Sequence, residues 1–244
     1  MTSPRAPRDP ARLHLVLMLA LTFTTGIVDA VGYLGLDRVF TANMTGNVVI
    51  LGMALAGSDD LPVLGPALAL VGFMLGAAVG GRVTARAPQG WSGRSTGTFA
   101  ATGVLALGLG VAALLEPPAE RTVWAFAVTT VLAVAMGLQA ATARRLAVKD
   151  VTTVVVTSTL TGLAADSRLA GGTGAGWARR LLAVVLILAG AGVGALLLHV
   201  GGQSGVGTGM VIAGVATLVA ATVGHRWAHH RRTPAPAAPD AARA

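Results

Sequence analysis

Apolar segments separated by short polar connections occupy almost the whole chain. They are residues 13–36, 39–57, 61–81, 96–115, 121–143, 151–165, 181–200 and 205–224. An α-helix crosses a bilayer in about 20 residues, and most of these segments approach or exceed that length with few charged residues, while Pro and Gly mark the connections. The pattern predicts an all-α, polytopic membrane helix bundle.

The segments 39–57 and 151–165 are more polar or shorter than the other six. The first contains the run TANMTGN, and the second is a brief run rich in Val, Thr and Ser. Irregular backbone is tolerated inside a membrane where it lines a cavity, so we expect both segments to be short, broken or re-entrant helices. About six full spans remain, although segment 39–57 is also long enough to cross.

The charges in the connections favour six spans. If segments 39–57 and 151–165 do not cross, every basic connection falls on the same side of the membrane as both termini, as the positive-inside rule requires. The protein is then expected in the inner (plasma) membrane with cytoplasmic N- and C-termini. The basic connections are residues 82–95, 144–150 and 166–180, and the acidic ones are 58–60 and 116–121.

The second half of the chain repeats features of the first at an offset of 111 to 112 residues. Gly26 aligns with Gly137, and Thr45 aligns with Thr157. Three spans in each half would give the copies opposite orientations, an inverted repeat of the kind found in transporters; chance similarity between Ala/Val/Gly-rich helices is the alternative. The expected organisation is a disordered cytoplasmic tail at 1–12, repeat 1 at 13–115, a linker at 116–120, repeat 2 at 121–225, and a basic, then Pro/Ala-rich cytoplasmic tail at 226–244.

Composition agrees with the membrane assignment and excludes several function classes. Hydrophobic residues make up 54% of the chain and charged residues 11%, with a mean hydropathy of +0.71, whereas soluble domains carry about 25% charged residues. The net charge of +8 is concentrated in connections and tails, so it indicates contact with a lipid bilayer and not a nucleic-acid partner. The chain has no Cys, which excludes disulfides, thiolate catalysis and Cys-ligated metals.

Asp29 is an acid inside the first apolar segment. It shares a helical face with Thr22, Gly26 and Tyr33. A carboxylate within a span costs at least about 2.5 kcal/mol on insertion scales, so it usually faces a cavity or a partner. We interpret Asp29 as a group that binds a solute, a proton or a cation; the alternative is a structural carboxylate that pairs with Arg38 or caps the next helix.

Hydroxyl and amide side chains are frequent in segment 39–57 and recur in the second half. Such groups can replace the hydration shell of a solute, and free amides at a helix N-terminus favour an anionic group. Hydrogen bonding between helices and capping are the structural alternative. The candidate substrate- or ion-binding residues are Asp29, Tyr33, Thr41, Asn43, Thr45, Asn47, Gln139, Thr153, Thr157 and Thr159.

Gly72, Gly76 and Gly80 form a stripe of small residues on one helical face. Stripes of this kind are packing surfaces, either between helices of one chain or between protomers. The second alternative predicts a homo-oligomer through this face.

Four stretches resemble a known family when they are taken together: GIVDAVGYLGL, VFTANMTGNVVILG, GLQAATARRL and VTTVVVTSTLTGL. They are similar to the YoaK-like family of bacterial multi-pass inner-membrane proteins, a domain of unknown function. The resemblance extends over about residues 12–225, and MTGN at 44–47 is its most specific part. It implies a polytopic membrane protein and carries over no substrate or catalytic residue.

These observations together predict a transporter of a small solute, with a polar site where the two repeats meet. A channel is the nearest alternative, and a non-transporting membrane scaffold or accessory subunit is the alternative from a different class; an enzyme acting on lipids comes third. The sequence contains no phosphate loop, metal-binding triad or nucleophile–His–acid set, so catalysis, a cofactor and a metal are not expected.

Overall fold

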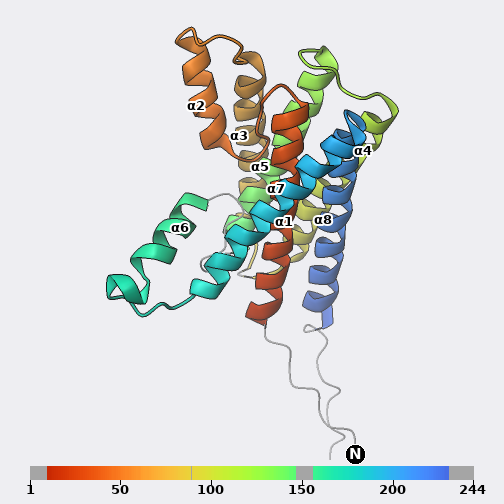
Figure 1. The fold of residues 1–244 in the computed structure, drawn as a ribbon. Helices are drawn as coiled ribbons and strands as arrows, with labels where there is room; N and C mark the ends of the chain where they lie inside the picture. The colour runs from red at the N-terminus through yellow and green to blue at the C-terminus, as the bar shows by residue number, and fades with distance from the viewer. Residues whose placement is uncertain (1–9, 89, 147–155, 231–244) are drawn as a thin grey trace, which may run out of the picture.

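The computed structural model describes residues 10–88, 90–146 and 156–230, and these residues form a helical bundle without strands (Figure 1). Helices α1, α3, α4, α5, α7 and α8 are long and apolar enough to cross a membrane, whereas α2 has 12 residues and α6 has 10. The predicted all-α bundle of six spans and two short helices is confirmed. The elements are α1 Pro10–Gly35, α2 Met44–Leu55, α3 Leu64–Thr84, α4 Gly93–Leu115, α5 Val123–Leu146, α6 Val156–Ala165, the short 3₁₀-helix η1 Arg168–Ala170, α7 Trp177–Gly201 and α8 Ser204–His230.

The helix ends differ from the expected boundaries at both termini. Helix α1 begins at Pro10 and α8 continues to His230, so helix extends into the two predicted tails. Proline fits the first turn of a helix because its missing N–H would have no partner there. The first and last helices therefore extend beyond the apolar segments from which they were predicted.

Helix α1 packs against α7 in a parallel direction through glycines. A Cβ on Gly190 would collide with the backbone of Phe23, and one on Gly194 would collide with the backbone of Ile27. In return, Gly26 lies against the carbonyl oxygen of Ile187. Small residues allow helix backbones to approach this closely in a membrane, where dispersion contacts replace the hydrophobic effect as the main attraction.

The stripe of Gly72, Gly76 and Gly80 packs within the chain. The three glycines of α3 lie against the backbone carbonyl oxygens of α5, at Thr130, Val134 and Leu138 respectively. Of the two predicted alternatives, the stripe therefore packs between helices of one chain. A homo-oligomer would have to use another face, because α5 covers this one.

Helices α4 and α8 form the third close pair, and they run antiparallel. Gly103 lies against the carbonyl oxygen of Gly214, and Gly110 lies against that of Gly207.

The six long helices differ in how deeply they are buried. In the most apolar 18 residues of each helix, the buried share is greatest in α1, at 67%, and least in α7, at 17%. The first helix therefore lies inside the bundle, and α7 presents most of its surface to the surroundings.

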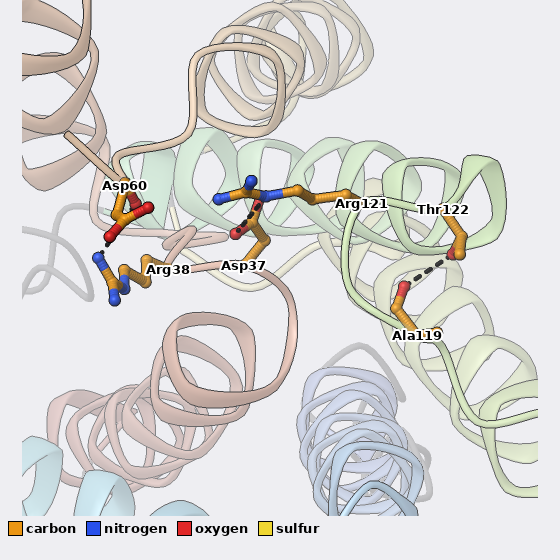
Figure 2. A network of polar contacts seen from close by, with 6 residues as sticks. All are labelled: Asp37, Arg38, Asp60, Ala119, Arg121 and Thr122. Atoms are coloured by element: carbon orange, nitrogen blue, oxygen red, sulfur yellow. Dashed lines mark hydrogen bonds and ion pairs between the residues drawn. The ribbon is translucent and has the colours of Figure 1, made fainter. Parts of the chain in front are cut away.

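Polar contacts join three connections at one end of the bundle, as Figure 2 shows. The side chain of Arg121 forms an ion pair with Asp37 at 3.4 Å, and Arg38 Nη1 donates to the carbonyl oxygen of Asp60 at 3.1 Å. All four residues have φ between 55° and 62°, a left-handed conformation that few non-glycine residues adopt. The chain therefore reverses direction sharply after α1, and this turn is held to the starts of α3 and α5.

The glycine contacts predict a position-specific cost of larger side chains. Gly76→Leu places a side chain against the α5 backbone, whereas Gly81→Leu meets open space on the same helix. We expect Gly76→Leu to lower the free energy of unfolding by about 1–3 kcal/mol or to prevent the helix bundle from forming. Gly81→Leu should have little effect on the free energy of unfolding. Thermal melts of the detergent-solubilised chain, followed by size-exclusion chromatography, measure this. Equal melting temperatures would contradict the packing described.

Candidate functional site

The segment after α1 folds back along the helix that precedes it. The turn at Asp37 and Arg38 reverses the chain, and residues 39–43 then run beside the last turns of α1. Gly32 makes this possible, since a Cβ there would collide with the carbonyl oxygen of Val39. The backbone of residues 41–43 is thereby brought to Asp29.

The carboxylate of Asp29 holds the start of α2. Its Oδ1 accepts hydrogen bonds from the backbone N–H groups of Thr41 at 3.0 Å, Ala42 at 2.7 Å and Asn43 at 3.3 Å. Residues 41–43 lead into α2, whose N-cap is Asn43, so their N–H groups have no partner within a helix, and leaving such groups unpaired away from water is costly. Of the two structural alternatives, Asp29 therefore adopts the capping role, and Arg38 bonds to Asp60 instead.

Two asparagines complete the structure around this helix start. Asn47 is fully buried and pairs with both backbone groups of Phe40: its Oδ1 accepts from the N–H at 2.9 Å, and its Nδ2 donates to the carbonyl oxygen at 2.6 Å. Asn43 is the N-cap of α2, and its Oδ1 accepts from the N–H of Gly46 at 3.3 Å. Both amides therefore fix the path of the backbone.

Phe40 is held between two elements. Its ring stacks on that of Tyr33, with centroids 4.8 Å apart and planes inclined by 25°. On α2, a Cβ at Gly46 would collide with the Phe40 ring. The glycine of the MTGN stretch is thus required by close contact with an aromatic side chain.

A cavity of about 550 Å³ lies beside these residues. Its wall comes from α1, the following segment, α2, α6 and α7, and its volume is within the range of about 300–1,000 Å³ typical of small-molecule sites. Polar groups and aliphatic side chains share the lining. The described lining residues are Thr25, Asp29, Tyr33, Phe40, Ala42, Asn43, Thr45, Gly46, Val49, Ile50, Val156, Thr157 and Ile187.

The predicted site residues fall into three groups. Those that line the cavity are Asp29, Tyr33, Asn43, Thr45 and Thr157. Thr41 and Asn47 are fully buried and do not line the cavity. Gln139 of α5 lies behind the wall and donates from Nε2 to Thr25 Oγ1 at 3.3 Å, Thr159 of α6 is outside the lining, and Thr153 lies outside the described residues.

Eight of the described lining residues were not among the predicted candidates, and Thr25 and Phe40 are the polar and the aromatic residue among them. Thr25 precedes Asp29 by one helical turn, so i, i+4 spacing could have identified it. Phe40 carries no such signal, because an aromatic residue next to an apolar segment usually indicates packing.

The capping geometry predicts how Asp29 variants affect stability. Asp29→Asn keeps an oxygen acceptor for the three N–H groups, whereas Asp29→Leu removes it and leaves buried donors unpaired. We expect Asp29→Leu to lower the free energy of unfolding by about 1–3 kcal/mol more than Asp29→Asn, as measured by thermal unfolding in detergent. A change at the exposed ion pair of Asp166 with Arg180, Asp166→Leu, should cost less. Asp29→Leu and Asp29→Asn of equal stability would exclude the capping role.

Comparisons with known proteins bear on the whole chain. The family described as "Protein of unknown function (DUF1275)" matches residues 17–223. The UPF0700 transmembrane protein YoaK of Bacillus subtilis (strain 168) is 34% identical over 151 residues, which is 62% of this chain and 65% of that protein. The chain thus aligns with slightly less than two thirds of this relative's length. No solved structure matches it.

The family match begins about two turns into α1 and ends about two turns before the end of α8, so it includes most or all of every span and all the described lining residues of the cavity. The transmembrane relative and the six apolar helices agree on a multi-pass architecture. This multi-pass integral membrane protein belongs to the DUF1275 family, and YoaK is one of its relatives.

Proposed function

We propose that this protein transports a small solute, and that the solute binds in the cavity between α1, α2, α6 and α7. The observation that supports this most is the meeting of both short helices at one polar cavity. Thr45 and Gly46 in the first turn of α2, and Val156 and Thr157 in the first turn of α6, all line it. Transporter sites are commonly built from discontinuous helices near the middle of the bilayer.

The arrangement of the two short helices supports the same proposal. In Figure 1, α2 lies toward one end of the bundle and α6 toward the other, and each begins on the side nearer to its counterpart. Neither crosses the bundle. The cavity is therefore bordered by half-length helices that approach it from opposite ends.

An inverted repeat is supported by equivalent helix contacts. The contact of Phe23 with Gly190 corresponds to that of Val134 with Gly76. Likewise, the contact of Ile27 with Gly194 corresponds to that of Leu138 with Gly80. The residues of α1 and α5 in these pairs are related by the offset found in the sequence, and α1 and α5 run in opposite directions (Figure 1).

The distribution of charge supports cytoplasmic termini in the inner membrane. Among the described residues, the acids other than Asp29 and Asp166 lie in the α1–α2, α2–α3 and α4–α5 connections, at the end of the bundle where α1 ends. Of the arginines that the structure describes, all except Arg38 and Arg121 lie at or near the opposite end, where α1 begins and α8 ends (Figure 1). The positive-inside rule assigns that basic end to the cytoplasm.

A channel would use the same cavity as a transporter. The alternatives therefore differ in the function that each of them assigns to the cavity. The scaffold alternative gives no role to an internal volume with a carboxylate in its wall, whereas transport does. Among these alternatives, transport accounts for both the broken helices and the polar lining.

Transport predicts that filling the cavity stops uptake. Val49 lines the cavity, while the adjacent Val48 does not, and both are about half exposed, at 54% and 57%. We expect Val49→Trp to abolish uptake of at least one solute into proteoliposomes, and Val48→Trp to retain it. Mass spectrometry of vesicles incubated with a pool of small metabolites measures the uptake. Unchanged profiles for wild type, Val49→Trp and empty vesicles would contradict transport.

The topology predicts which positions are accessible from each side. Single cysteines can be introduced freely, because the natural chain has none. Ser58→Cys and Gln203→Cys should react with an impermeant maleimide applied to intact cells, and Thr173→Cys only after the membrane is opened. Labelling of Thr173→Cys from outside would contradict six spans with cytoplasmic termini.

A further inference from the structure

We infer that the ligand of this cavity is a small organic cation, an amine or a quaternary ammonium ion with an apolar part. The inference rests on the proposed function in one respect, since the bound cation would be the transported solute. The binding itself follows from the charge, the aromatic rings and the size of the cavity.

The charge of the wall favours a cation. Asp29 is buried, with 9% of its surface exposed, and lines the cavity without an ion-pair partner among the described residues. The described ion pairs are Asp37 with Arg121 and Asp166 with Arg180, and none of these groups lines it. A buried carboxylate is stabilised by a neutralising partner. A bound cation would supply that partner, whereas an anion would be repelled.

The Asp29 carboxylate has capacity for this contact. The three backbone hydrogen bonds all go to Oδ1. An ionised carboxylate offers two oxygen atoms with about four acceptor positions. One oxygen can therefore hold α2 while the other meets a ligand.

Two aromatic rings line the same cavity as the carboxylate. The faces of Tyr and Phe rings attract cations, and quaternary ammonium ions are bound in this way. Tyr33 and Phe40 are fixed by stacking on each other, and Gly46 supports the Phe40 ring. The pair is already ordered before a ligand arrives, so little entropy is lost on binding.

The size and the apolar part of the cavity favour a molecule over a bare ion. A metal ion requires oxygen ligands at about 2.0–2.6 Å on most sides, which a cavity of about 550 Å³ does not provide. Val49, Ile50, Val156 and Ile187 form an aliphatic part of the wall. Hydrocarbon groups of a ligand would be buried favourably against them.

A matched pair of probes tests the inference. Choline and 3,3-dimethyl-1-butanol have nearly the same shape, but the first carries a positive charge and the second is neutral. Hexylamine and hexanol provide a second pair for primary amines. We expect isothermal titration of the full detergent-solubilised chain to show at least about tenfold tighter binding of a cationic probe than of its neutral counterpart.

The variants identify the groups responsible. Asp29→Asn, which keeps the cap on α2, should remove the preference for charge, and Asp37→Asn, outside the cavity, should leave it intact. Tyr33→Leu should weaken binding of the quaternary ion, whereas Tyr33→Phe should preserve it, because the ring face provides the attraction. Melting temperatures of each variant show that the fold is retained.

The outcomes separate this inference from transport itself. A charge preference that depends on Asp29, without uptake into proteoliposomes, supports the cation site and overturns transport. Uptake of neutral or anionic solutes that Val49→Trp blocks, without a preference for either cationic probe, supports transport and overturns the cation site. A preference that persists unchanged in Asp29→Asn also overturns the cation site.

Discussion

The hydrogen bonds from three backbone amides to one oxygen of Asp29 determine the structure around the cavity. The backbone that leads into α2 has no secondary structure of its own, and its N–H groups need an acceptor where water is excluded. Asp29 supplies it from the neighbouring helix. The segment carrying Phe40 is thereby placed against Tyr33, and α2 begins beside the cavity.

Glycine contacts between the long helices form the frame to which this arrangement is attached. The α1–α7, α3–α5 and α4–α8 pairs bring backbone against backbone, which leaves little freedom for the helices to separate. The short helices are held differently: α2 packs mainly on α3, and α6 packs mainly on α7 and has no buried residue. Elements with few buried contacts open at low free-energy cost, so α6 is the part of the cavity wall best suited to move in the transport that we propose.

Asp29 combines the structural role that its hydrogen bonds show with the functional role that we propose for it. Its Oδ1 holds the α2 backbone, and the carboxylate lines the cavity in which we propose that a cation binds. A change of charge at this group would therefore affect both the ligand and the first turn of α2. Such a shared group is a physical link between occupancy of the site and the position of a short helix, which alternating access requires.

The sequence by itself determined that about six spans and two short helices are present, and that an acid, Asp29, lies inside the first span. Span length and the cost of a charge in lipid are local properties, so apolar runs and single acids reveal them directly. Only the tertiary structure decided which side chains line the cavity. Thr41 and Asn47 resemble Asn43 and Thr45 in sequence, yet the first two are buried and the last two line the wall. The directions of these side chains depend on the left-handed turn at Asp37 and Arg38 and on the Asp29 carboxylate, which binds the backbone that follows the turn. Neither constraint can be read from the local pattern of polar residues.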